Sequence, residues 1–331
     1  MPLARYRLVD PGTTPYYHCI SRCVRRAFLC GRDSCTGRNF DHRKQWILDR
    51  IKRLSSAFAI DVCAYAIMSN HFHLVLCIDS QAATGLSDKE VIERWLLLFK
   101  GPELARKHLA GESLTAWESK ALLSLVEVWR SRLSDLSWYM RCLNEAIARQ
   151  ANAEDNCTGR FWEGRFKSQA LLNEAALISC MAYVDLNPIR AEICDTLESS
   201  DFTSIQERLR DWSSSQSKGK KTWLKPLKSP GGPDSRDKIP IQSLDYFELV
   251  DWTGRAIRHD KRGAIPAQVE PILKRLNVVE KNWVENTEQF GRRFYRALGR
   301  VNQIRKLARR SNQRWLHGLK AAQGFYHYPC S

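Results

Sequence analysis

Two histidines separated by one residue are the first feature of this sequence that could do chemistry. They lie in 64–78, which predicts two short apolar strands joined by a turn at 69–70. Because strand side chains alternate between faces, His71 and His73 should point the same way and Phe72 into the opposite layer. Two imidazoles on one strand face form half of a divalent metal site. The alternative is a pair of half-exposed histidines without a ligand.

A predicted helix in the second half of the chain carries another group of candidates. It begins at Asn173 or Glu174, and Pro188 helps to end it. At about 100° per residue, one face is apolar and is expected to pack on the sheet: Leu177, Ile178 and Met181. The other face is small or polar apart from one phenol: Ala176, Ser179, Cys180, Tyr183 and Asn187. Room is therefore expected around Tyr183, with Asn187 beside it one turn later.

Together, the histidine pair and this tyrosine fit one chemistry. A metal held by His71, His73 and the amide oxygen of Asn187 keeps positions open for phosphodiester oxygens. The phenol of Tyr183, whose ordinary pKa is about 10, becomes a nucleophile when a nearby cation or base favours its phenolate. Its attack gives a phosphotyrosine and a free sugar hydroxyl. Because the bond energy is kept, this chemistry favours strand transfer over hydrolysis.

The composition points to a polyanionic partner. The formal net charge is +16 and the pI is near 9.5, for which nucleic acid is the default partner. No run of about 18 apolar residues is present to span a bilayer, and the first residues lack the apolar stretch of a signal peptide. The cysteine count is odd, 11, which suits reduced thiols. We expect a cytoplasmic, nucleoid-associated protein with no membrane partner.

The order of predicted elements indicates an α+β fold. Residues 15–24 predict a first strand, in which His18 is either structural or faces DNA. Residues 40–58 have helical spacing, and the two strands with the histidine pair follow. Strand, helix and hairpin open a ferredoxin-like antiparallel sheet with helices on one face. Residues 81–135 predict a helical insertion, and 169–172 a final core strand.

The same reading divides the chain into three parts. Residues 1–200 form the predicted catalytic domain. Residues 201–240 are rich in Ser, Lys, Gly and Pro towards their end and predict a linker. Residues 241–331 predict a basic, mostly helical C-terminal DNA-binding region.

Two segments combine basic and aromatic residues. In 158–168, Arg160, Arg165 and Lys167 alternate with three aromatics, which suits backbone contact and base stacking on single-stranded nucleic acid. The alternative is a structural loop with two buried aromatics. Residues 289–331 contain no acidic residue and ten Lys or Arg. We expect phosphate contacts there rather than a merely solvated face, from Arg292, Arg293, Arg296, Arg305, Lys306, Arg309 and Arg310.

Three motifs, in this order, resemble the HUH single-tyrosine transposases, and most of all the REP-associated tyrosine transposases. They are Met68-Ser-Asn-His-Phe-His-Leu-Val, Gly159-Arg-Phe-Trp-Glu-Gly-Arg-Phe-Lys-Ser and Tyr183-Val-Asp-Leu-Asn-Pro-Ile-Arg-Ala. The resemblance covers about 14–195. It implies the HUH endonuclease fold and Mg²⁺- or Mn²⁺-dependent cleavage of single-stranded DNA beside imperfect, REP-like hairpins. It also implies a 5′-phosphotyrosine on Tyr183, metal ligands His71, His73 and Asn187, and a monomer or homodimer.

Some alternatives stay open. The segment 81–135 is longer than the compact family core needs, and 240–331 has no counterpart in the smallest members. A non-catalytic, domesticated DNA-hairpin-binding regulator is the main alternative from another class. A relaxase or replication initiator and an RNA-binding sheet are further ones. Imidazole ligands lean towards Mn²⁺, whereas phosphate oxygens and cellular abundance favour Mg²⁺.

Overall fold

The computed structural model describes residues 8–24, 29–33, 37–215, 222–229, 235, 237–258 and 266–327. Its first half contains these elements: β1 (Tyr16–Arg22), α1 (His42–Ala57), β2 (Ile60–Ile67), β3 (His71–Ile78), α2 (Ser80–Gly85), α3 (Asp88–Leu96), α4 (Glu103–Leu109), α5 (Ala116–Leu133), α6 (Leu136–Glu154), β4 (Lys167–Leu171) and α7 (Glu174–Asp185). Its second half contains these: α8 (Asn187–Arg190), α9 (Ser204–Ser215), β5 (Leu227–Lys228), β6 (Ile239–Gln242), α10 (Ser243–Ile257), α11 (Val269–Arg275), α12 (Glu280–Glu288), α13 (Phe290–Arg293), β7 (Ala297–Leu298), α14 (Val301–Arg310) and α15 (Leu319–Phe325).

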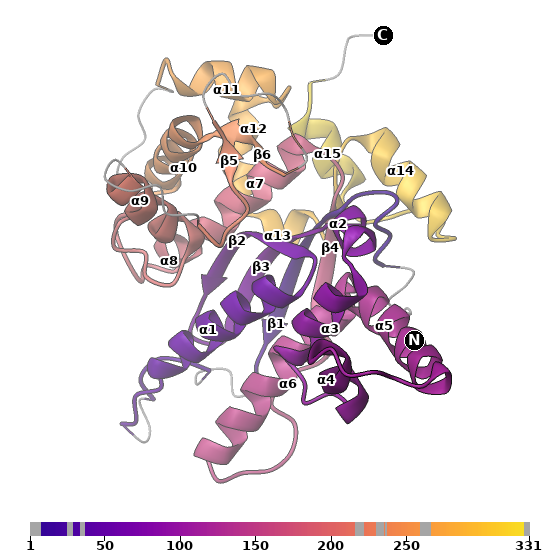
Figure 1. The fold of residues 1–331 in the computed structure, drawn as a ribbon. Helices are drawn as coiled ribbons and strands as arrows, with labels where there is room; N and C mark the ends of the chain where they lie inside the picture. The colour runs from indigo at the N-terminus through magenta and orange to yellow at the C-terminus, as the bar shows by residue number, and fades with distance from the viewer. Residues whose placement is uncertain are drawn as a thin grey trace.

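The predicted α+β class is confirmed by a central sheet of five strands in the order β2-β3-β1-β4-β7 (Figure 1). The first four strands pair antiparallel, and the short β7 pairs parallel with β4. The predicted hairpin is β2 and β3. The expected last core strand is β4, but it is not the edge of the sheet, because β7 from the C-terminal region adds to it.

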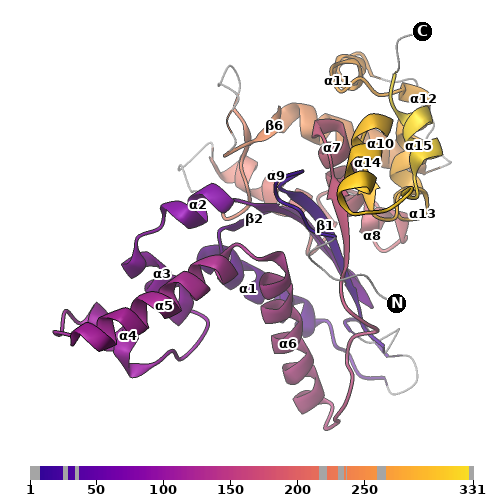
Figure 2. The ribbon, with the colours of Figure 1, turned by 90° about the vertical axis from the view of Figure 1, so that its right-hand side faces the viewer.

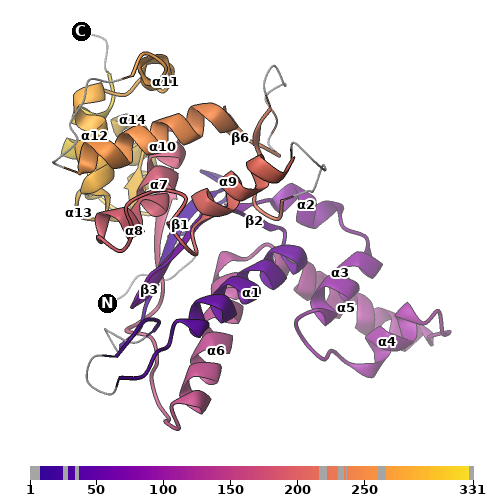
Figure 3. The ribbon, with the colours of Figure 1, turned by 90° about the vertical axis from the view of Figure 1, so that its left-hand side faces the viewer.

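Helices cover both faces of this sheet, so the expectation of helices on one face is wrong (Figures 2 and 3). One core contains α1, α5, α6 and the side chains of Phe72, Leu74 and Leu76 from β3. The other contains α7, the C-terminal helices and Val75 and Cys77 from the opposite face of β3. A strand that is apolar on both faces needs cover on both sides, and here the second cover comes from the C-terminal region.

The segment 81–135, predicted to be helical, contains most of α2 and all of α3 to α5, which extend beyond the sheet on the side of α1 (Figure 3). Capping boxes begin two of its helices, at Ser87 for α3 and Thr115 for α5. Trp95 stacks on Trp129, with 5.4 Å between their ring centroids, and so joins α3 to α5. The insertion is therefore a packed helical unit.

The segment expected to be a linker begins with a packed helix. Ile205 and Arg208 of α9 are buried, and Ser204 accepts a hydrogen bond from the backbone N–H of Tyr65 in β2. The most linker-like stretches by composition fall largely in 216–221 and 230–234, which lie outside the described residues. The helix itself packs on the sheet.

The C-terminal region supplies part of the core rather than only a surface. Trp283, Phe290 and Phe294 are buried in the same core as α7. No helix among the described residues is both long and apolar enough to cross a bilayer.

Candidate active site

Three histidines meet on one face of the sheet. His71 and His73 point the same way from β3, with ring centroids 4.8 Å apart. Phe72 points into the opposite layer, where its ring meets that of Trp162 edge-on. The predicted alternation is therefore confirmed. His18 of β1 is buried and lies beside His73, 5.1 Å away between ring centroids and nearly parallel, so its structural interpretation is the correct one.

Hydrogen bonds hold the three rings in place. His18 Nε2 is 2.9 Å from His73 Nδ1, and His18 Nδ1 is 3.1 Å from Gln169 Oε1 on β4. His71 Nδ1 pairs with the side-chain oxygen of Asn70. The buried Nε2 of His73 has no hydrogen-bond partner within the described part of the chain. An orphaned polar nitrogen in a protein interior calls for an explanation.

Burial keeps these imidazoles neutral at pH 7. It lowers the pKa of His18 to about 4, and that of His71 also to about 4, with the charge of Arg22 and the neighbouring His18 adding to the effect. Burial and the neighbouring His71 hold the pKa of His73 well below its usual range. Neutral imidazole is the form that binds metal ions.

Tyr183 reaches this cluster from α7. Its ring meets that of His73 edge-on at 5.6 Å and that of His18 at 5.9 Å between centroids. The tyrosine face of α7 therefore faces the sheet, and the prediction that the apolar face packs there is wrong. Asp185, about 200° around the helix from Tyr183, bonds instead to α9 and α10. All eleven residues 175–185 are buried, because the C-terminal helices α10 and α12 also contact α7.

Asn187 lies beside Tyr183, as the helical period predicts, but its amide is already hydrogen bonded. Its nitrogen donates to the backbone oxygens of Tyr183 and Val184, at 3.1 and 3.4 Å. Its oxygen accepts a long bond, 3.4 Å, from Arg190. The Arg190 guanidinium also lies over the Tyr183 ring, with its carbon 4.6 Å from the centroid. An amide oxygen has two lone pairs, so one of them is still open to a metal ion beside this bond.

The donor set fits a divalent metal in part. Among the described residues, the Nε2 of His73 is a buried nitrogen without a partner, and His71, whose Nδ1 is engaged, would offer its Nε2 to a metal. Across the described residues, no three or more His, Cys, Asp or Glu side chains are grouped so as to hold a metal ion. A metal here would therefore depend on two imidazoles and on oxygen ligands from an amide, water or phosphate.

Helix α13 covers the tyrosine. Phe290 stacks on the Tyr183 ring, with 4.9 Å between centroids and 22° between planes. A Cβ atom at Gly291 would lie 3.3 Å from the phenol oxygen of Tyr183. Tyr183 is 8% exposed. Helix α13 is therefore part of the cover of the candidate nucleophile.

The loop 158–168 is built around its aromatics. Phe161 and Trp162 are buried, so the expectation that they stack on bases is wrong, and the structural alternative holds for them. Arg160 donates to the backbone oxygens of Trp162 and Glu163 and so shapes the loop. Arg165 and Lys167 are exposed, Lys167 at the start of β4.

The basic residues of the C-terminal region have different environments. Arg305, Lys306 and Arg309 are exposed on α14, whose Ile304 and Ala308 are buried. Arg310 bonds to Thr13 and Asp10, and Arg293 to Glu285 and Asn286. Arg292 is exposed and Arg296 is half-buried. Within the described part of the chain, Arg305, Lys306 and Arg309 therefore form an exposed basic face on α14.

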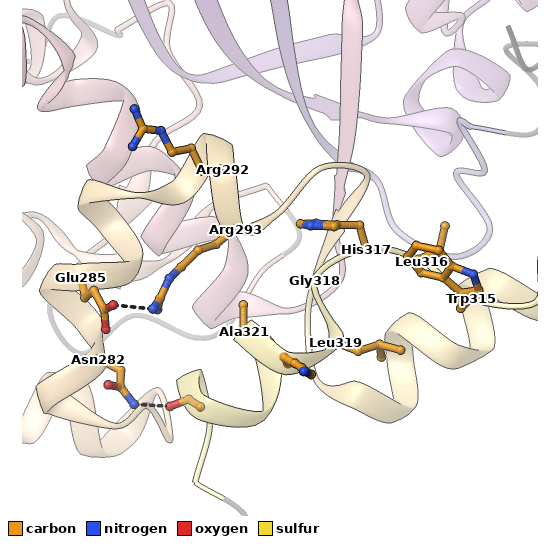
Figure 4. A pocket seen from close by; sticks show the side chains of 12 residues that line it. Asn282, Glu285, Arg292, Arg293, Trp315, Leu316, His317, Gly318, Leu319 and Ala321 are labelled. Carbon is orange, nitrogen blue, oxygen red and sulfur yellow. Dashed lines mark hydrogen bonds and ion pairs between the residues drawn. The ribbon is translucent and has the colours of Figure 1, made fainter.

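A cavity of about 710 Å³ lies in the same region, between α12, α13 and the segment that leads into α15 (Figure 4). Arg293 extends towards Glu285 on one side of it, and Trp315 lies on the other. Trp315 is 68% exposed. Arg292, Lys320 and the exposed Trp315 also line the cavity, so it combines basic side chains with an aromatic surface.

Sequence reasoning did not assign four residues at this site: His18, Gln169, Arg190 and Arg22. Alternation along the first strand places His18 on the same face as Tyr16. It does not predict the strand register that sets His18 beside His73. Arg22 pairs with His71 across the β1–β3 ladder. These contacts depend on strand register, which local sequence does not specify.

Among solved structures, the chain is similar to the structure of a REP-associated tyrosine transposase bound to a REP hairpin. The two are 11% identical, the match covers 63% of this chain and 86% of that chain, and the TM-score is 0.38. No family model matches this chain, and no curated protein does.

Proposed function

We propose that this protein is a metal-dependent DNA strand transferase that cleaves single-stranded DNA beside hairpins through Tyr183. The observation that carries the proposal is the meeting of Tyr183 with His73, 5.6 Å apart between ring centroids, where the buried Nε2 of His73 has no partner among the described residues. The order of β1, α1, β2, β3, α6 and β4, with strand order β2-β3-β1-β4, supports a ferredoxin-like sheet of the HUH type.

In the proposed reaction, the phenol oxygen of Tyr183 attacks a backbone phosphorus. The new Tyr–O–P bond forms as the bond from phosphorus to the 3′-oxygen breaks, which leaves a 5′-phosphotyrosine and a free 3′-hydroxyl. The phenol proton passes to solvent, and the leaving 3′-oxygen takes up a proton. The Arg190 guanidinium lies over the Tyr183 ring, beside the position proposed for the phosphate. Reversal onto another 3′-hydroxyl completes strand transfer.

A divalent ion, Mg²⁺ or Mn²⁺, would neutralise charge at the phosphate when bound by His71 and His73. Asn187 is the candidate third ligand through the second lone pair of its side-chain oxygen, which already accepts a long bond from Arg190. The exposed Arg165 and Lys167 at the start of β4, and the basic face of α14, would hold the DNA backbone.

One observation favours a second function. Tyr183 is almost fully covered by Phe290 and Gly291. A protein that only binds DNA hairpins, such as a domesticated regulator, needs no access to that phenol. The two functions differ in whether a covalent product forms.

The deciding experiment is incubation of the full chain with labelled single-stranded hairpin DNA and Mn²⁺. A protein–DNA band that survives a denaturing gel, disappears with EDTA, and maps by mass spectrometry to the peptide with Tyr183 is the expected result. A hairpin-specific shift on a native gel without any covalent band would instead support the binding protein.

Removing the basic face of α14 should weaken DNA binding through the phosphate backbone. We expect the triple variant Arg305→Ala, Lys306→Ala, Arg309→Ala to lower affinity and to reduce the slope of log K against log salt by about 2, since each single-strand phosphate contact contributes about 0.7. Arg310 is left in place because it bonds to Thr13 and Asp10. Fluorescence anisotropy at several salt concentrations measures the slope.

The matched control removes three exposed charges from other surfaces: Lys89→Ala, Lys120→Ala and Lys281→Ala. It has the same net charge as the α14 variant. An equal loss of slope in both variants would show that overall charge, not α14, attracts the DNA.

A further inference from the structure

A chain of three hydrogen bonds leads from the C-terminal region to the orphaned nitrogen of His73. The side-chain nitrogen of Gln169 is 2.6 Å from the backbone oxygen of Phe294. Gln169 Oε1 is 3.1 Å from His18 Nδ1, and His18 Nε2 is 2.9 Å from His73 Nδ1. Gln169, His18 and His73 are each at most 5% exposed. Water therefore does not compete for these bonds.

The direction of every bond in this chain follows from its first member. A backbone carbonyl only accepts, so the Gln169 atom that faces Phe294 is the amide nitrogen, and Oε1 faces His18. Oε1 only accepts, so His18 Nδ1 carries a proton. His18 is fully desolvated with uncharged partners on both nitrogens, which favours the neutral ring, and Nε2 then accepts. His73 Nδ1 must therefore donate.

We propose that His18 and Gln169 are positioning residues that fix His73 in its Nδ1–H tautomer. The lone pair of His73 is then on Nε2, the buried atom that has no partner among the described residues. Outer hydrogen bonds of this kind fix the ring orientation and raise the basicity of metal-binding histidines. This inference deepens the proposed function and rests on it, because the tautomer serves metal binding by His73. The tautomer itself can be observed without metal.

The first test uses the unaltered, metal-free chain. Two-bond ¹H–¹⁵N correlation spectra at pH 7.5 distinguish the two imidazole tautomers, and His73→Gln assigns the signal. We expect His73 with the proton on Nδ1. A spectrum with the proton on Nε2 would overturn the inference, whatever the protein does to DNA.

Two substitutions at one position separate an electronic role from packing. In Gln169→Glu, a buried carboxyl that stays protonated donates to the Phe294 carbonyl as the amide does and keeps an uncharged acceptor for His18 Nδ1–H. His73 should then stay in the Nδ1–H form. Gln169→Leu removes that acceptor, so His18 can place its proton on Nε2 and donate to His73, which then carries its own proton on Nε2. The same tautomer in both variants would contradict the relay, and thermal unfolding checks that both are folded.

Metal binding gives the second readout. Titration calorimetry with Mn²⁺ should show affinity about 10–100-fold weaker for Gln169→Leu than for the unaltered chain, the usual size of such outer-sphere effects, and near-normal affinity for Gln169→Glu. Ser179→Ala is the control, since its buried hydroxyl in α7 has no partner in the described part of the chain. If His73→Ala binds Mn²⁺ as well as the unaltered chain, the metal site of the proposed function fails. If His73→Ala loses Mn²⁺ affinity but Gln169→Leu binds Mn²⁺ as well as the unaltered chain, the relay fails.

Discussion

Replacing Tyr183 by phenylalanine is expected to abolish the covalent protein–DNA product while DNA binding remains. The substitution removes only the phenol oxygen, which is the proposed nucleophile, and leaves the ring that packs on Phe290 and His73. Loss of a nucleophile in other covalent enzymes lowers the rate by on the order of 10⁴-fold or more. Quantified denaturing gels give the cleavage rate, and anisotropy with the same hairpin gives the affinity.

Tyr139→Phe is the matched control. Tyr139 lies in α6, in the core on the opposite face of the sheet, and its buried hydroxyl has no partner among the described residues. Its removal should leave both cleavage and binding unchanged. Cleavage by Tyr183→Phe at the normal rate would eliminate Tyr183 as nucleophile and with it the proposed reaction.

The second large effect concerns stability, at Asp185. This carboxylate is fully buried and accepts three hydrogen bonds, from the Ser204 hydroxyl, the Ile205 backbone N–H and the Tyr246 hydroxyl. It therefore joins α7 to the first turn of α9 and to α10. Asp185→Ala leaves the Ile205 N–H and the Tyr246 hydroxyl without this acceptor, and the Ser204 hydroxyl with only the Tyr65 backbone oxygen at 3.4 Å. We expect it to lower the free energy of unfolding by about 3–5 kcal/mol. Urea unfolding followed by circular dichroism measures this loss.

The same carboxyl predicts a pH dependence. Burial raises the pKa of Asp185 to about 6, although its hydrogen bonds to Ser204 and Tyr246 oppose the effect. The ordinary pKa, which applies to the unfolded chain, is about 3.9. Between these values the folded state binds more protons, so the stability contributed by the protonated carboxyl is complete below pH 4 and is lost as the pH rises to 6. The expected loss is on the order of 2–3 kcal/mol.

Asp185→Asn isolates the contribution of this titrating carboxyl to the pH dependence of the free energy of unfolding. Its amide keeps an oxygen for Ser204 and Ile205 and offers a donor to the Tyr246 oxygen, so the variant should fold. The free energy of unfolding of the unaltered chain minus that of the variant should fall between pH 4 and 6. Asp195→Asn, at a carboxyl that is exposed, is the control substitution. A flat difference for Asp185→Asn would mean that the buried carboxyl does not titrate in this range.

Local periodicity determined much of the site. Alternation along β3 is enough to place His71 and His73 on one face and Phe72 on the other. The helical period is enough to place Asn187 beside Tyr183. The charges of 289–331 likewise follow from the sequence alone. These features depend on neighbours within one element, and the backbone geometry of that element fixes them.

Tertiary structure decided which surfaces these elements meet. The apolar face of α7 could pack on the sheet or on another helical layer, and only the docking of α10 and α12 turns Tyr183 towards His73. The bond between His18 and His73 depends on the register of β1 against β3. The cover of Phe290 over Tyr183 joins residues more than 100 positions apart. An apolar face specifies that it must be buried, not by what, so these contacts follow from the packing of the whole chain.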